Sequence, residues 1–165
     1  MTIRRAVPSD RPAAVALWTA LHREHEAQDA RYRLAPDAAA RWATDFRTWA
    51  RSDADRIWLA LDDQADEAPA GLLTAHLYTP APTFAPSLMV YVDDLYVAPR
   101  ARRRGVARGL LDAARAWAVA SEATEIRAGV LASNPAARAF WARTGGVDFS
   151  VVVTVGLTAP GAQPS

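Results

Sequence analysis

The chain has 165 residues, of which 51% are hydrophobic, and its formal net charge at pH 7 is +1. This composition excludes a disordered chain, and the near-neutral charge gives no reason to expect a nucleic-acid partner. The sequence contains no cysteine, which excludes a disulfide framework, a thiolate nucleophile and a zinc–sulfur site.

The N-terminal third predicts a strand followed by two helices. The strand is Thr2–Val7, and Ser9 and Asp10 are typical of a helix N-terminus, from which the apolar spacing runs to about Glu26. The second helix begins near Pro36, and aromatic side chains recur in it at i, i+4 and i+7. We interpret this stripe as core rather than as a ligand site; its members are Trp42, Phe46 and Trp49.

Three strands are predicted in the middle of the chain. Arg56–Asp62 and Gly71–Thr79 carry apolar side chains on either side of a polar turn, which indicates a hairpin. Pro80–Ser87 is a loop, because its three prolines prevent regular strand pairing. Leu88–Val97 is the third strand of this region.

The C-terminal third alternates helices and strands. After a basic turn comes a helix, then a buried strand Ile126–Leu131, a helix that starts at Asn134, and an apolar final strand Phe149–Leu157. The order β-α-α-β-β-β-α-β-α-β predicts one α/β domain over residues 1–158, with a mixed, mostly antiparallel sheet and helices on both faces. Residues 159–165 are expected to be a flexible tail.

His22 and His25 lie three residues apart on the first predicted helix, a spacing that could ligate a metal. No third ligand is evident in the sequence. We therefore interpret this pair as a partly exposed helix surface and expect no metal.

The turn Arg102-Arg103-Arg104-Gly105-Val106-Ala107-Arg108 follows a strand and opens a helix. A helix N-terminus has unpaired N–H groups and a partial positive charge of roughly half a unit. Gly105 has no Cβ and Ala107 a small one, so an anion can approach the backbone closely. The three preceding arginines add mobile positive charge. These features predict a phosphate or pyrophosphate ligand.

Two motifs resemble those of the GCN5-related N-acetyltransferase (GNAT) family. The turn fits the family's [RQ]-x-x-G-x-[GA] at Arg102, Gly105 and Ala107, after a strand Asp93–Pro99 of the family's type. Asn134–Gly146, with Phe140 and Trp141 inside it, resembles the second signature, N-x-x-A-x-x-F-Y-x-x-x-G-F. The resemblance extends over about residues 88–148.

The resemblance implies acetyl transfer from acetyl-CoA, as co-substrate, to an amine by direct attack in a ternary complex. It also implies a set of cofactor-binding residues. Backbone groups of the strand would bond the pantetheine, the turn would hold the pyrophosphate, and the second motif would contact the cofactor. The residues so implied are Leu95, Tyr96, Val97, Arg102, Arg103, Arg104, Gly105, Val106, Ala107, Arg108, Asn134, Phe140 and Trp141.

A general base is expected, because an alkylamine with a pKa of about 10.4 is mostly protonated at neutral pH and freeing its lone pair costs roughly 4–5 kcal/mol. Asp93 and Asp94 lie on the strand before the turn, and side-chain alternation predicts that only one of them faces the acceptor cleft. Asp93 matches the position of a glutamate base in some family members. Asp93 is therefore our candidate base; the alternative is that both are ordinary strand-edge carboxylates.

Trp141 stands where many family members have a tyrosine that protonates the departing thiolate. An indole N–H does not ionise usefully. Three interpretations stay open: the thiolate leaves unaided with Trp141 packed near the thioester, Tyr91 or Tyr96 supplies the proton, or Trp141 is a core residue of its helix. We favour the first.

The function predicted is an N-acetyltransferase acting on a small-molecule or peptide amine. The alternatives are a catalytically weak acyl-CoA binding or sensing module, and phosphate binding by an unrelated α/β domain. No apolar run approaches the roughly 18–20 residues of a membrane span, so no membrane partner is expected. Met1–Arg5 lacks the apolar segment of a signal peptide, so we expect a cytoplasmic protein. The sequence leaves a homodimer open and does not identify the acceptor.

Overall fold

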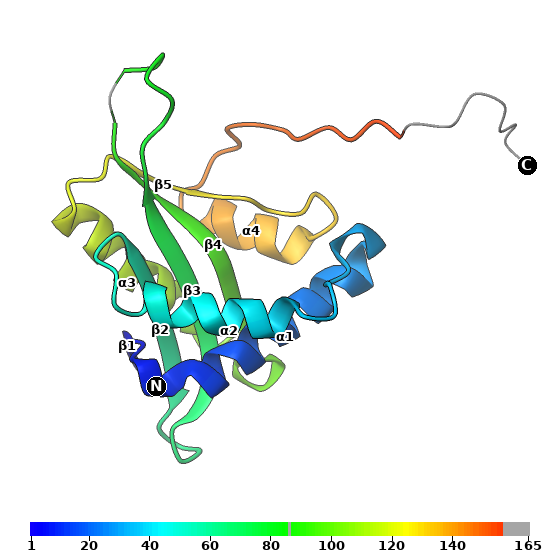
Figure 1. Ribbon diagram of the computed structural model, residues 1–165, viewed down its shortest axis with the longest axis vertical. Helices are drawn as coiled ribbons and strands as arrows, with labels where there is room; N and C mark the ends of the chain where they lie inside the picture. Colours follow the sequence, from blue (N-terminus) through cyan, green and yellow to red (C-terminus); the bar gives the residue numbers. More distant parts are fainter. Residues whose placement is uncertain (86, 157–165) are drawn as a thin grey trace, which may run out of the picture.

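Five strands form one sheet in the order β1-β2-β3-β4-β5, in a computed structural model that describes residues 1–85 and 87–156 (Figure 1). Neighbouring strands are antiparallel except β4 and β5, which are parallel. This is the mixed, mostly antiparallel α/β sheet that the sequence predicts. The strands are β1 (Thr2–Arg5), β2 (Asp55–Asp62), β3 (Ala68–Tyr78), β4 (Met89–Val97) and β5 (Glu125–Ala128).

Helices cover both faces of the sheet. On one face α1 and α2 pack over Ile57, Leu59 and Leu72; on the other, α3 packs over Trp58 and Leu73, and α4 contributes a partly buried side chain. The helices are α1 (Arg11–Gln28), α2 (Ala38–Trp49), α3 (Val106–Ala120) and α4 (Pro135–Arg143). Single 3-10 turns precede α1, follow it and follow β4: η1 (Pro8–Asp10), η2 (Ala30–Tyr32) and η3 (Pro99–Ala101). Within residues 1–85 and 87–156, none of the helices is long and apolar enough to cross a membrane.

The aromatic stripe on α2 belongs to the core, as predicted. Trp42 and Phe46 are buried, and Trp49 packs against the same cluster. Trp42 stacks on Trp18 of α1 with ring centroids 5.4 Å apart. This contact fixes the two helices against each other on one face of the sheet.

The sheet opens between β4 and β5. Their pairing ends at Val92 and Ala128, so among the described residues the second half of β4 has only β3 as a strand neighbour. The sequence predicted a longer strand, Ile126–Leu131, but β5 starts at Glu125 and ends at Ala128. The prediction was wrong beyond Ala128 because a strand needs a partner for its backbone groups and β4 has diverged there.

The predicted final strand is absent from the sheet. Residues 149–156 have no regular secondary structure and no strand partner in the part of the chain that the structure describes, although five of them carry large hydrophobic side chains that are 72–93% exposed. A run of β-branched residues does not by itself form a strand, because its backbone groups must also pair with the open edge of another strand. Leu157, the end of the predicted domain at 158 and the predicted tail 159–165 lie outside the described residues.

Candidate functional site

A β-bulge in β4 places two carboxylates on one face of the sheet. Thr74 of β3 pairs with Asp94, but Ala75 pairs with Val92, so Asp93 is an extra residue in β4. The Thr74 hydroxyl donates to Asp94 Oδ2 at 2.7 Å, and His76 Nδ1 lies 2.9 Å from Asp93 Oδ2. Thr74 and His76 are two residues apart on β3 and therefore face the same side.

The bulge corrects the expectation that only one of the two acids faces the cleft. Simple alternation puts neighbouring side chains on opposite faces, whereas the residue inserted at the bulge places Asp93 and Asp94 on the same face. Both lie on the side covered by α1 and α2. No local signal in the sequence marks this bulge.

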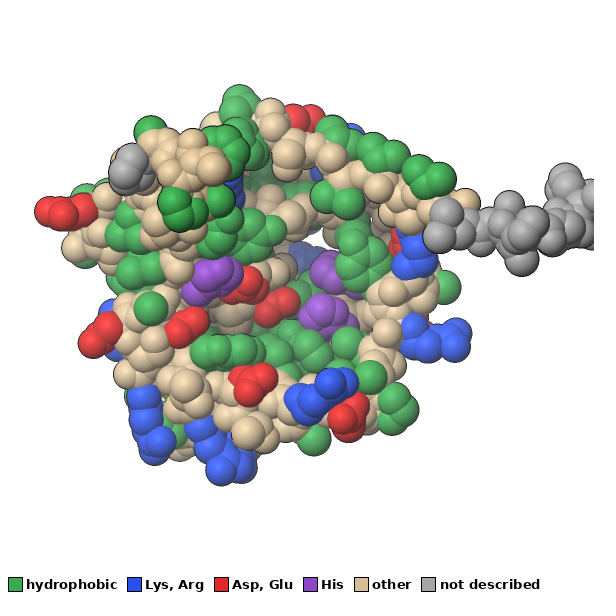
Figure 2. Space-filling model, turned by 45° about the horizontal axis from the view of Figure 1, so that its top comes forward, with side chains coloured by type: hydrophobic (Ala, Val, Ile, Leu, Met, Phe, Trp, Pro, Cys, Tyr) green, Lys and Arg blue, Asp and Glu red, His purple; other side chains and the backbone are tan. Residues whose placement is uncertain are grey.

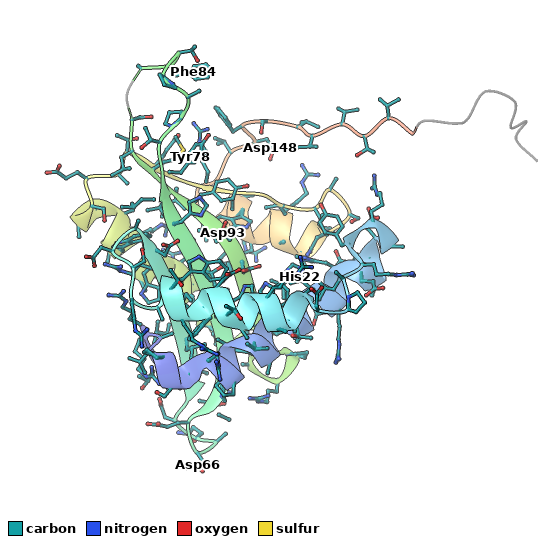
Figure 3. All side chains as sticks on the ribbon, in the orientation of Figure 1. His22, Asp66, Tyr78, Phe84, Asp93 and Asp148 are labelled. Atoms are coloured by element: carbon teal, nitrogen blue, oxygen red, sulfur yellow. The ribbon has the colours of Figure 1, made fainter. Side chains whose placement is uncertain are left out.

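The hollow between α1 and the open part of the sheet collects all three histidines of the chain together with these acids (Figure 2). His22 Nε2 lies 3.6 Å from Asp94 Oδ1, and the His22 and His25 rings are 5.6 Å apart, edge to face. Figure 3 shows His22 and Asp93 approaching this hollow from α1 and from β4. The interpretation of His22 as mere helix surface was therefore incomplete. Within the described residues, no group of three or more His, Cys, Asp or Glu side chains could hold a metal.

The two carboxylates differ in exposure and partners. The Asp93 side chain is 43% exposed and its partner His76 37%, whereas Asp94 is 11% exposed and has two neighbours, Thr74 and His22. Burial raises the pKa of Asp93 above its ordinary value, and the hydrogen bond from His76 opposes that rise. The raised pKa makes Asp93 a better proton acceptor, and its exposure leaves it within reach of a substrate.

The basic turn before α3 has the backbone geometry that the sequence predicts. Gly105 adopts φ +80°, a left-handed conformation, and is immediately followed by the first residue of α3. Apart from the glycine and its two chain neighbours, no described residue has an atom within 4 Å of the position that a Cβ would take there. The N–H groups of the first helical turn have no partner inside the helix. An anion can therefore be held by backbone groups.

The arginines of the turn are less mobile than expected. Arg102 forms a two-point ion pair with Glu24 of α1, at 2.6 and 2.7 Å, and also donates to the Val97 carbonyl at 3.0 Å. Arg104 binds the buried Asp62 at 2.7 and 3.3 Å, and it lowers the pKa of that carboxyl. The idea of three free arginines was wrong, because two of them tie the turn to α1 and β2.

Tyr96 belongs to the same network. Its hydroxyl donates to Glu24 Oε1 at 3.1 Å, and burial together with the Glu24 carboxylate raises its pKa. A phenol is a poor acid when its pKa is raised and its proton is already donated to a carboxylate. Of the two tyrosines considered as proton donors, Tyr91 is the better placed. Its ring lies 5.6 Å from the His76 ring. Its hydroxyl lies beside Gly129, 3.1 Å from the position that a Cβ would take on that glycine.

The residues of the second motif lie on α4. Asn134 caps this helix by accepting a bond from the Ala137 N–H at 2.9 Å. Phe140 and Trp141 are half-buried, and Trp141 packs against the cluster on the α3 side of the sheet. This packing matches the core interpretation of Trp141; its contact with a thioester stays a prediction. The helix ends at Arg143, and Gly145, with φ +93°, turns the chain after it.

The comparisons with known proteins agree with this fold. The model of the acetyltransferase (GNAT) family matches residues 15–146. A tetramutant of the BH1408 protein from Bacillus halodurans superposes with a TM-score of 0.85 at 21% identity, covering 95% of this chain and 100% of its own. Aminoglycoside 6'-N-acetyltransferase AAC(6')-Ih from Acinetobacter baumannii gives 0.75 at 19% identity, covering 96% and 98%.

A third similar structure holds a ligand. AAC(6')-Iy, in complex with the bisubstrate analog CoA-S-monomethyl-acetylneamine, gives a TM-score of 0.74 at 18% identity, covering 96% of this chain and 98% of its own. No curated protein sequence matches the chain. At these identities the solved structures establish a shared fold.

Proposed function

Because the chain belongs to the acetyltransferase (GNAT) family, we propose that it transfers the acetyl group of acetyl-CoA to the amine of a small molecule or peptide. The observation that carries this proposal is the arrangement along β4. Asp93 of this strand and His76 of the neighbouring β3 face an open hollow, and the end of β4 leads through η3 into the Gly105 turn. An amine site and an anion site thus adjoin one open strand.

The open side of β4 suits an extended, amide-containing arm. Beyond Val92 the strand has no described strand neighbour on the β5 side, so the backbone groups of Leu95 are free to bond the pantetheine. Those of Tyr96 are turned toward β3, because the Ala98 N–H bonds to the Ala70 carbonyl and every second residue of an antiparallel strand bonds to the same neighbour. The Val97 carbonyl already accepts a bond from Arg102 Nε, so Val97 would contribute chiefly through its N–H. The pyrophosphate would then meet the N–H groups of Val106, Ala107 and Arg108 at the start of α3.

Direct transfer consists of three events. The amine gives up a proton, its nitrogen bonds to the thioester carbonyl carbon, and the carbon–sulfur bond breaks to release CoA thiolate. Asp93, paired with His76, would accept the proton. The negative charges of Asp93 and Asp94 would also attract a protonated amine to the hollow.

The leaving group needs little help. A thiolate with a pKa near 8.5 departs readily, and loss of acid assistance is worth about 10²–10⁴ in rate at most. Trp141 cannot supply a proton and Tyr96 is engaged with Glu24. If an acid takes part, Tyr91 is the residue we propose. The aminoglycoside N-acetyltransferases among the similar structures support a small-molecule acceptor.

The test is to measure free CoA release with a panel of small amines and peptides, beside a direct titration of acetyl-CoA binding. We expect saturable binding and amine-dependent CoA release. Binding without release for any amine would favour the alternative of an acyl-CoA binding or sensing module, to which the missing tyrosine at position 141 points. Absence of binding would contradict both.

A further inference from the structure

Three rings lie side by side on the sheet face that carries Asp93. The Tyr91 ring lies 5.6 Å from the His76 ring, and the Tyr78 ring lies 6.4 Å from it, edge to face. Tyr91 pairs with His76 across the two strands, and Tyr78 follows His76 by two residues on β3. All three side chains therefore share one face of the sheet. We name His76, Tyr78 and Tyr91 the aromatic shelf.

The aromatic shelf is open to solvent. Tyr78 is 42% exposed and the His76 side chain 37%, and Tyr91 is half-buried. The two core clusters formed by the described residues include none of the three. Aromatic side chains that adjoin a polar site and are not used in the core are available to pack against the ring of a ligand.

The aromatic shelf leads from Asp93 toward the loop that joins β3 to β4. At its near end His76 Nδ1 lies 2.9 Å from Asp93 Oδ2. Tyr78 lies one pleat further along β3, a distance of about 6–7 Å. Figure 3 shows Asp93, Tyr78 and Phe84 in succession from the hollow toward this loop. A ligand whose nitrogen meets Asp93 can thus lay the rest of its surface on the shelf.

The accessible charge of the hollow suits a single ammonium. Asp93 is the more exposed of the two acids, whereas Asp94 accepts a bond from the Thr74 hydroxyl at 2.7 Å and lies 3.6 Å from His22 Nε2. One positive charge at Asp93 therefore satisfies the accessible carboxylate. The remainder of the ligand meets the aromatic shelf, which favours an aromatic surface.

We propose that the acceptor is an arylalkylamine: a primary amine whose nitrogen meets Asp93 and whose aromatic ring lies on the aromatic shelf. The inference rests on the proposed transfer reaction and narrows its acceptor. Because Tyr78 lies one pleat beyond the partner of Asp93, a linker of about two or three carbons joins the nitrogen to the ring. The ring would then exchange water for contact with Tyr78 and Tyr91.

The experiment compares CoA release by the full chain with four primary amines. In γ-phenylpropylamine the ring stands at the expected distance, and in benzylamine it is too close to the nitrogen. Hexylamine has similar length without a ring, and hexamethylenediamine adds a second charge. We expect kcat/KM for γ-phenylpropylamine to exceed each of the others at least about tenfold.

The other outcomes separate this inference from the transfer reaction. Release at equal kcat/KM for hexylamine or benzylamine would keep the reaction and overturn the arylalkylamine. A higher value for the diamine would also overturn it and would point to Asp55, which pairs with His76 from β2, as the site of the second charge. No release with any of these amines, beside release with other amines or peptides, would overturn the inference alone. No release with any amine at all would overturn both.

Two tyrosines of equal exposure provide the matched pair. Tyr78→Leu removes a ring of the aromatic shelf and should lower kcat/KM for γ-phenylpropylamine at least about fivefold, chiefly through KM, with less than about a twofold change for hexylamine. Tyr32→Leu removes a ring that is 43% exposed and lies 5.9 Å from the His25 ring, beside α1, and should change neither value. Tyr78→Phe keeps the ring and should keep the preference. Equal effects of Tyr78→Leu and Tyr32→Leu would contradict the proposal, and far-UV circular dichroism checks that each variant is folded.

Discussion

The Gly105 turn and the hollow around Asp93 lie at two places along one strand, yet they use charge in opposite ways. In the turn, Arg102 and Arg104 are held by Glu24 and Asp62, so we expect an anion there to be held largely by backbone N–H groups. In the hollow, Asp93 and His76 pair with each other and stay about two-fifths exposed, so their side chains remain available to a substrate. Changes in the turn should therefore alter affinity, and changes in the hollow should alter rate.

The largest effect is expected at Asp93. Asp93→Asn removes the proton acceptor and should lower kcat by about 10²–10⁴ with a basic amine, while the acetyl-CoA dissociation constant changes little. Asp94→Asn is the matched control, because it keeps the shape of a carboxylate that is bonded to Thr74 and only 11% exposed. The measurement is steady-state CoA release with each variant.

The pH profile checks the same assignment. The pKa of Asp93 is raised, so the active carboxylate form is lost as the pH falls through that raised value. Transfer by the unsubstituted protein should fall on this acid side, and Asp93→Asn should lack that limb. Equal rates of Asp93→Asn and the unsubstituted protein over about pH 6 to 9 would show that Asp93 is not the base.

The next effect concerns the turn. Gly105→Val places a β-branched residue at φ +80° and should weaken acetyl-CoA binding at least about tenfold, because the backbone can no longer keep its N–H groups in place. Gly145→Val is the matched control: Gly145 has φ +93° and also has open space around its Cβ position. Both variants should lose stability, but only the first should lose affinity, as measured by calorimetric titration. An unchanged dissociation constant in folded Gly105→Val would contradict the role of this turn.

Trp141 is expected to act on stability more than on rate. It packs against the cluster on the α3 side, so Trp141→Phe should leave a void and lower the free energy of unfolding by roughly 1–3 kcal/mol. Transfer per folded molecule should remain, because an indole is not an acid. A thermal melt and a transfer assay separate the two quantities.

Trp141→Tyr restores the family's residue; a marked rise in its transfer rate would place position 141 beside the thioester. A Phe variant that folds normally but is inactive would show that the indole N–H takes part in the reaction.

The smallest effect is expected at Glu24, and it tests the comparison most directly. Glu24→Gln releases Arg102 from an ion pair whose partners are 46% and 38% exposed, so stability should change by less than about 1 kcal/mol. Cofactor affinity should change less than about threefold, because the backbone does the binding. If the freed arginine tightened acetyl-CoA binding about tenfold, the arginine side chains and not the backbone would be the main anion ligands. Calorimetric titration measures this.

Much of the fold could be read from the sequence, because the signals that define it are local. The aromatic stripe of α2, the prolines before β4 and the glycine that opens α3 each act within a few residues along the chain, where periodicity and backbone preferences are visible. The order of elements up to α4 follows from them. The Gly105 turn was identified in the same way, since its conformation depends on its own residues.

Tertiary structure decided what depends on residues far apart in the chain. Glu24 meets Arg102 across 78 positions and His76 meets Asp93 across 17, so neither pair has a spacing that a sequence can reveal. The bulge at Asp93 exists only as a mismatch between β3 and β4. The prediction of a final strand was wrong for the same reason. The sequence determined the apolar alternation of this segment, but a strand also needs a partner edge, and only three-dimensional contact supplies one.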